Sequence, residues 1–292
     1  MRSFPHRAAL SRPSRDRAFS LVELLVVIGI IAVLIAILLP TLAAARASAT
    51  ATASLSNLRQ LGLGLLIYRD EHRGAYPVGA MPPGTGPRVR WADMIYPYMR
   101  NTEVYLSPVL DQNERDRMKK PFAHTCDPAA NPGILPSTIY YGGYGYNYQY
   151  LGNGRNPGGI APFHARESMV PAASQTVALA DTQGSRDGWA AGEGVYVIDP
   201  PLQSRDMGSR GSRKTSADPL AAGNYGYRGG SDGEPPTSDK RAIPAERNRG
   251  RVNVLMCDAH TEPMTLRQLD DFNGDGMPDN GYWNGKADAS QR

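Results

Sequence analysis

The longest apolar run of the chain lies near its N-terminus, from Leu21 to Leu39, and only Glu23 and the small Gly29 interrupt it. As a helix rising about 1.5 Å per residue, this run spans roughly 28 Å, which is close to the hydrocarbon thickness of a bilayer. The pattern therefore predicts a transmembrane helix over residues 21–39.

A helical pattern continues beyond Pro40. Residues 41–54 are rich in Ala, Ser and Thr, and apolar side chains then recur at roughly helical spacing, at Leu55, Leu58, Leu61 or Leu65, and Tyr68. We expect one helix over residues 19–72, about 80 Å long, whose second half presents an apolar stripe to a folded domain. Gly62 and Gly64 have low helix propensity and predict a local kink.

The rest of the chain has the pattern of short strands joined by long connections. Three apolar runs predict β-strands, at residues 177–180, 195–198 and 252–256. The chain contains 31 Gly and 24 Pro, so many turns are expected, with a long loop over residues 203–250. The sequence thus predicts an α+β fold, with a globular domain over residues 73–269 and a C-terminal tail over residues 270–292.

The formal net charge of +4 comes from the N-terminus alone. The first 18 residues hold five arginines and one aspartate, which leaves 27 basic and 27 acidic residues in the remainder. A neutral remainder gives no reason to expect nucleic acid as a partner. The arginines before Leu21, against a single Arg46 shortly after Leu39, favour a cytoplasmic N-terminus and export of the rest by the positive-inside rule.

Three interpretations of the apolar segment compete. A secretory signal peptide would be cleaved in the Ala-rich residues 43–49, but its apolar region is usually about 7–15 residues long. A plain membrane anchor leaves Glu23 unexplained, because a charge at the bilayer centre costs about 2.5–3.5 kcal/mol and is normally retained for a partner. The third interpretation gives Glu23 a role in assembly.

Residues 17–28 read Arg-Ala-Phe-Ser-Leu-Val-Glu-Leu-Leu-Val-Val-Ile. This segment resembles the cleavage and methylation segment of type IV prepilins and type II secretion pseudopilins. The resemblance implies that a prepilin peptidase removes a leader of residues 1–18 by cutting between Ala18 and Phe19, and then methylates the new N-terminus. Ala18 departs from the glycine that is usual before the cut.

The same resemblance implies a fold and a role for Pro40. The fold is a long N-terminal helix, membrane-spanning in its first half, packed on a C-terminal antiparallel β-sheet domain with long loops. Pro40 corresponds to a proline that loosens the helix in many members of the family.

The chemistry of the segment agrees with this resemblance. Cleavage would leave a positively charged amine on Phe19, four residues from Glu23. In a bundle of such helices, the amine of one subunit pairs with the carboxylate of a neighbour, and an unpaired charge in the apolar core costs several kcal/mol. The pair would set the axial register of a helical, non-closing assembly.

Residues 270–279 have the pattern of a short, dockerin-like calcium loop. Oxygen ligands at positions 1, 3, 5, 7 and 9 would come from Asp271, Asn273, Asp275, the carbonyl of Met277, and Asp279. Position 12, where an EF-hand has a bidentate Glu, is Tyr282, so we expect weak binding, about 10⁻⁴–10⁻³ M. The alternative is an Asp/Asn/Gly turn that holds no ion.

Three smaller features each have two interpretations. Cys126 and Cys257 form a disulfide in an oxidising compartment or remain separate buried thiols. The Tyr-rich residues 140–150 form either a stacking platform for a ligand or aromatic packing within the domain. Asp258 and His260 form either an acid–base pair or, as we expect, the stabilising groups of a turn.

The sequence around that turn adds to the resemblance. Residues 252–260 are similar to a C-terminal hairpin of pilin-like proteins in which an Asp-Gly-His turn follows an Asn-Val strand. Ala259 replaces the glycine here, which makes a turn with positive φ less favourable.

Catalysis is not expected. Residues 229–233 match G-x-S-x-G, but no apolar strand precedes them and no helix follows, so the match carries no mechanism. The histidines are scattered without metal-ligand spacing.

These features predict a structural subunit of a pilus-like filament, most closely a type II secretion pseudopilin. We expect a single-pass inner-membrane protein with a cytoplasmic N-terminus and a domain in the periplasm or at the cell surface. Its expected partners are the prepilin peptidase, other pilin or pseudopilin subunits and the inner membrane, and calcium is its one expected cofactor. The alternative is a minor pilin or surface adhesin whose globular domain binds a glycan or another ligand.

Overall fold

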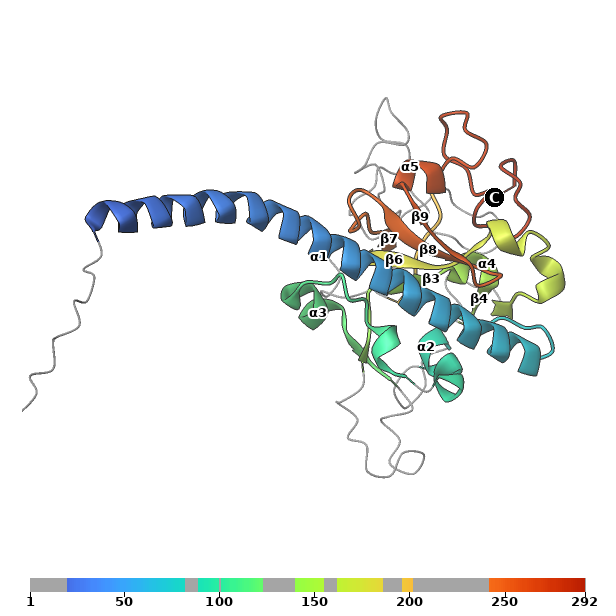
Figure 1. Cartoon of the computed structure of the whole chain (residues 1–292). Coiled ribbons are helices and arrows are strands. Elements are labelled where there is room, and N and C mark those ends of the chain that lie inside the picture. The colour runs from blue at the N-terminus through green and yellow to red at the C-terminus, as the bar shows by residue number, and fades with distance from the viewer. Residues whose placement is uncertain are drawn as a thin grey trace, which may run out of the picture. The chain divides into compact units, whose positions relative to one another are not determined.

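The structure is a computed structural model that describes residues 20–81, 89–99, 101–122, 140–154, 162–185, 196–201 and 242–291. The chain divides into two compact units, residues 1–46 and 47–292, and helix α1 (Leu21–Glu71) belongs to both (Figure 1). Several predicted features lie outside the described residues: the leader 1–18, the bond between Ala18 and Phe19, Cys126, and residues 203–241 with the G-x-S-x-G match.

Helix α1 confirms the long helix that the apolar pattern predicts. It runs without interruption for 51 residues, through Pro40. Proline has no N–H to donate to the carbonyl one turn earlier. In the same turn, the hydroxyl of the following residue donates to the backbone, from Thr41 Oγ1 to Leu38 O at 2.9 Å.

The second half of α1 packs one side against the larger unit. The residues of this buried stripe are Ser54, Leu58, Leu61, Gly62, Gly64 and Leu65. The helix is unbroken at both glycines, which instead allow close packing. A Cβ on Gly62 would lie 2.8 Å from Leu255 Cδ1, and one on Gly64 would lie 2.6 Å from Met99 Sδ.

The larger unit is built on an antiparallel sheet, which confirms the α+β fold. Four strands follow the order β3 (Tyr144–Tyr146), β6 (Val177–Ser185), β8 (Val252–Met256) and β9 (Thr261–Met264), and β7 (Ala242–Pro244) also pairs with β6. The strand predicted at residues 252–256 is β8, and residues 177–180 begin β6. The strand predicted at 195–198 is wrong in the described part, because Val197 forms only an isolated bridge to Tyr146.

Short elements surround this sheet. They are α2 (Trp91–Ile95), η1 (Tyr96–Tyr98), η2 (Glu103–Tyr105), α3 (Gln112–Met118), β1 (Lys120–Pro121), β2 (Tyr140–Tyr141), α4 (Tyr148–Leu151), β4 (Gly152–Asn153), β5 (Phe163–His164), η5 (Glu167–Met169), η6 (Ala173–Gln175) and α5 (Leu266–Leu269). Strands β1 and β2 form one two-stranded antiparallel pair, and β4 and β5 form another.

The Tyr-rich segment lies in the core beside Trp91. Tyr141, Tyr144 and Tyr146 are at most 1% exposed, and the ring centroids of Trp91 and Tyr146 are 6.0 Å apart in a stacked arrangement. Trp91 Nε1 donates to Tyr196 O at 2.6 Å, which satisfies the one polar atom of the buried indole. The segment is therefore aromatic packing, and its described tyrosines offer no exposed stacking platform.

The C-terminal segment also belongs to the core. Trp283 is fully buried and packs in an apolar cluster with Met256 and Leu269. Asn147 Nδ2 donates to both Val177 O (2.9 Å) and Trp283 O (3.0 Å), so one side chain joins β6 to this segment.

A buried carboxylate joins α1 to the sheet. Asp181 in β6 is fully buried, and four donors from separate segments surround its carboxylate: Ser54 Oγ (3.4 Å), Ser107 Oγ (3.3 Å), Asn248 Nδ2 (3.0 Å) and the N–H of Asn253 (3.3 Å). Burial raises the pKa of Asp181 to about 6, and the charge of Arg247 and these hydrogen bonds oppose part of that rise.

Candidate functional site

The N-terminus of α1 is held by a reciprocal pair of side chains. Ser20 Oγ accepts hydrogen bonds from the N–H groups of Val22 (3.2 Å) and Glu23 (3.4 Å). In return, Glu23 Oε2 accepts from the N–H of Ser20 at 2.9 Å. This arrangement is a capping box, in which a serine and a glutamate three residues later satisfy backbone donors that the first helical turn leaves open.

Glu23 therefore has a partner within its own chain. The spacing Ser-x-x-Glu before an apolar run is a sequence signal for a capping box, and Ser20 and Glu23 have this spacing. The other partner expected for Glu23, the amine of a cleaved Phe19, lies outside the described residues. The geometry thus gives Glu23 a local role beside the predicted role in assembly.

The apolar part of α1 has no partner among the described residues. Every residue from 20 to 49 is exposed, including the large side chains from Leu21 to Leu42. Within the described part of the chain, α1 alone is long and apolar enough to cross a membrane. Because burying this surface in lipid or in a partner is strongly favourable, the segment fits a single-pass membrane anchor.

The predicted calcium loop is an ordered turn closed by Asp279. The Asp279 carboxylate accepts the N–H groups of Phe272 (2.9 Å) and Gly281 (2.6 Å) and is 6% exposed. Gly274 and Gly276 have φ of +73° and +83°, the left-handed conformation that glycine adopts without strain. The loop thus brings the five predicted ligand residues into one short turn.

The other carboxylates of this loop bond its backbone. Asp271 Oδ2 accepts from Gly276 N–H (3.0 Å), and Asp275 Oδ1 accepts from Met277 N–H (2.8 Å). Asp271 Oδ1 is buried and has no hydrogen-bond partner among the described residues. Across those residues no group of three or more His, Cys, Asp or Glu side chains is arranged to hold a metal ion. Both the calcium site and the ion-free turn therefore stay predictions.

The Asp258 and His260 side chains bond each other across the β8–β9 turn. His260 Nδ1 lies 2.6 Å from Asp258 Oδ1, which also accepts the His260 N–H at 3.1 Å. Both side chains are about two-fifths exposed, and Ala259 between them has a φ of +70°. The contacts are those of a stabilised turn, in which alanine adopts the positive φ that the sequence makes less favourable.

The two cysteines are placed only in part. Cys257 is 3% exposed and forms no disulfide with any residue that the structure describes, and burial raises the pKa of its thiol well above the ordinary value for a cysteine. Cys126 lies beyond the described residues, so its pairing with Cys257 stays a prediction.

Comparison with known proteins gives two matches. Residues 13–39 match the prokaryotic N-terminal methylation motif. Residues 43–207, more than half of the chain, match a family described as proteins of unknown function (DUF1559). No curated protein and no solved structure matches the chain.

Proposed function

We propose, from the premise that the chain belongs to the DUF1559 family and carries a prepilin-type methylation motif at residues 13–39, that it is a pseudopilin of a type II secretion apparatus. At a coarser level it is a type IV pilin-like subunit, processed by a prepilin peptidase and assembled with other such subunits. The observation that supports the type IV pilin-like assignment is the motif over residues 13–39, whose residues from Leu21 onward form the exposed apolar start of α1.

The processing step has a direct consequence for the capping box. Cutting between Ala18 and Phe19 leaves Ser20 as the second residue of the mature chain, next to the new amine. The Ser20 N–H that Glu23 accepts stays in place, so the capping box survives the cut. The new charge lies one residue before this cap in the sequence, and the proposal pairs it with the Glu23 carboxylate of a neighbouring subunit.

Both roles of Glu23 operate in sequence. In the membrane-inserted monomer, the carboxylate caps its own helix, and this hydrogen bond lowers the cost of holding a charge near the membrane. In the filament, the same carboxylate pairs with the Phe19 amine of a neighbour. A charged pair in an apolar bundle penalises shifted registers, because any shift leaves two buried charges unpaired.

Two substitutions separate these roles. Glu23→Gln keeps an oxygen that accepts the Ser20 N–H but removes the charge. Ser20→Ala removes the capping hydroxyl but keeps the charge. The measurement is cysteine cross-linking of subunits in isolated filaments, with Glu23→Ala as the variant that loses both functions.

The proposal expects Glu23→Gln and Glu23→Ala to lose cross-linked multimers and Ser20→Ala to retain them. If Glu23→Gln assembles like the unchanged chain while Ser20→Ala does not, Glu23 acts only as a cap and the register role is wrong. Membrane levels of each variant, measured by immunoblot, separate failed assembly from failed insertion.

Calcium binding by residues 271–279 remains part of the proposal. The support is the ligand spacing, the two left-handed glycines and the closed turn. The ligands would be Asp271, Asn273, Asp275, the Met277 carbonyl and Asp279. In that case the ion would brace the C-terminal segment, whose Trp283 lies in the core.

The runner-up function is a minor pilin or adhesin whose domain binds a ligand. Burial of Tyr141, Tyr144 and Tyr146 removes the sequence feature that suggested glycan stacking. A binding role therefore needs another surface.

A further inference from the structure

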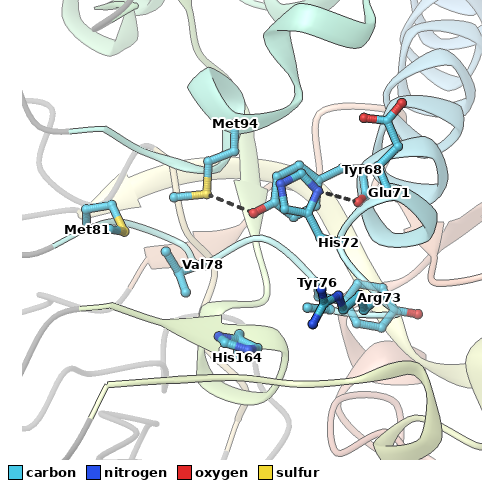
Figure 2. A pocket seen from close by; sticks show the side chains of 10 residues that line it. Tyr68, Glu71, His72, Arg73, Tyr76, Val78, Met81, Met94 and His164 are labelled. Atoms are coloured by element: carbon cyan, nitrogen blue, oxygen red, sulfur yellow. Dashed lines mark hydrogen bonds between the residues drawn. The ribbon is translucent and has the colours of Figure 1, made fainter.

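A cleft of about 420 Å³ lies beside the C-terminal end of α1 (Figure 2). It is lined by Tyr68, Glu71, His72, Arg73, Ala75, Tyr76, Val78, Met81, Met94 and His164. Ala75, Tyr76 and Val78 are buried and form its base, whereas both histidines, Arg73 and Met81 are exposed and form its rim. The volume falls in the range of cavities that bind small ligands, about 300–1,000 Å³.

One wall of the cleft is apolar and polarisable. The rings of Tyr68 and His72 stack with centroids 3.8 Å apart and an interplanar angle of 8°. Tyr68 Oη donates to Met94 Sδ at 3.9 Å, and Met81 nearby is 44% exposed (Figure 2). Thioether and aromatic side chains adapt to aromatic and branched aliphatic groups, so this wall suits an apolar side chain.

The polar side chains that line the cleft include two histidines, Arg73 and one carboxylate, Glu71. His72 Nδ1 is held by Tyr68 O at 2.8 Å, which fixes the ring and leaves Nε2 for a ligand. His164 lies on the opposite side of the cleft, on strand β5 (Figure 2). Glu71 is the acidic residue of the lining, and its carboxylate points away from Val78 and His164 (Figure 2).

Arg73 supplies a permanent positive charge at this rim, because a guanidinium stays protonated at any ordinary pH. Its φ of +56° is unusual for a residue other than glycine, and it places the side chain just beyond the last turn of α1. No described residue forms an ion pair or a side-chain hydrogen bond with its guanidinium. The end of the helix accounts for this conformation, because the N–H of Gly74 donates to Arg69 O at 2.9 Å, as in the left-handed turns that commonly end helices.

We propose that this cleft binds an amphipathic carboxylate. An aromatic or branched aliphatic group would lie on the wall formed by Tyr68, Met81 and Met94. Its carboxylate would lie at the rim, paired with the Arg73 guanidinium, which matches a carboxylate in geometry and charge. A free N-acylated amino acid and the C-terminus of a peptide share this chemistry.

The experiment uses the full chain in nanodiscs and N-acetyl-phenylalanine as the probe. Equilibrium dialysis measures binding, and the ¹³C-methyl NMR signals of Met81 and Met94 report its place. We expect saturable binding at millimolar concentrations or below, with shifts of both methyl signals. Arg73→Gln should weaken binding about tenfold, because a charge-assisted pair is lost. Arg59→Gln, an exposed arginine earlier on the same helix, should leave binding unchanged.

N-acetyl-phenylalaninamide lacks the carboxylate and should also bind about tenfold more weakly. Equal binding of the amide, equal binding by Arg73→Gln, or no saturable binding would overturn the proposal. A tripeptide ending in Phe with a free carboxylate distinguishes the two sources. Tighter binding than the probe indicates a peptide C-terminus, and weaker binding indicates a small molecule; both outcomes support the site.

Discussion

Gly62 in helix α1 lies directly against Ala259 at the tip of the β8–β9 turn. A Cβ on Gly62 would lie 2.9 Å from the Cβ of Ala259 and 3.2 Å from its Cα. Ala259 also has a φ of +70°, so an alanine occupies a position that favours glycine while a glycine occupies a helix that favours alanine. The contact joins the long helix to the last hairpin of the sheet.

Gly62→Ala should therefore destabilise the protein despite the better helix propensity of alanine. Overpacking costs about 1–3 kcal/mol, against a propensity gain of about 1 kcal/mol, so we expect a net loss of up to about 2 kcal/mol. Urea unfolding of the full chain in detergent measures it. Ser56→Ala, on the exposed side of α1, should change the free energy of unfolding by less than about 0.5 kcal/mol.

The double variant Gly62→Ala with Ala259→Gly tests the cause. Removing the Ala259 methyl group makes room for the new one, and glycine adopts the positive φ freely. Most of the lost stability should return. If the two changes are simply additive, the contact is not the reason for the glycine.

Asp181 should make stability depend on pH in a defined direction. Burial raises its pKa from 3.8 to about 6, so the folded state favours the protonated form. The stabilisation that protonated Asp181 gives the folded state is complete below about pH 4. It is lost as the pH rises through 6, which lowers the free energy of unfolding by up to about 3 kcal/mol.

Asp181→Asn should remove this dependence. The amide nitrogen can donate to the hydroxyls of Ser54 and Ser107, while the amide oxygen accepts the donors that Asp181 Oδ2 accepts now. We expect stability near that of the unchanged chain at pH 4 and higher stability at pH 8. Urea unfolding at both pH values gives the result; parallel pH profiles for the two proteins would reject this account of Asp181.

Asn147→Ala should loosen the C-terminal segment. It leaves the carbonyls of Val177 and Trp283 without their donor, at a cost of about 2–3 kcal/mol. Amide hydrogen exchange over residues 280–285 should rise in the variant. The control is Asn113→Ala on the exposed surface of α3; an equal effect there would mean that the bridge is unimportant.

Calcium should raise the thermal midpoint if the loop binds it. At 10 mM ion and a dissociation constant of about 10⁻⁴–10⁻³ M, the gain is about 1–3 kcal/mol, or about 2–6 °C. Asp271→Asn should abolish the shift. The control is Asp288→Asn, which removes an acidic side chain in a surface turn outside the motif and should leave the shift unchanged. Equal midpoints in millimolar calcium and in chelator would leave only the ion-free turn.

Local patterns in the sequence predict the elements that local physics decides. The apolar run from Leu21 predicts α1, and the largely apolar run at residues 252–256 predicts β8 with its observed bounds. The run at 195–198 is equally apolar, but its described residues lack a strand partner beyond one bridge at Val197. Short apolar runs cannot reveal such a difference, because pairing depends on residues far away in the chain.

The remaining features depend on contacts between distant segments. The sequence leaves the Tyr-rich residues open between a stacking platform and aromatic packing, and the structure shows them packed around Trp91, about 50 residues earlier. The donors around Asp181 come from four places in the chain, and no motif joins them. By contrast, the capping box of Ser20 and Glu23 could be predicted from the sequence, because its two residues are only three positions apart.

The most direct test of the central claim is the intact mass of the protein after expression with a prepilin peptidase. The account predicts a mature chain that begins at Phe19 and carries one N-terminal methyl group, with residues 1–18 removed. A chain that still begins at Met1, or one cleaved within residues 43–49 as a signal peptide would be, would contradict it.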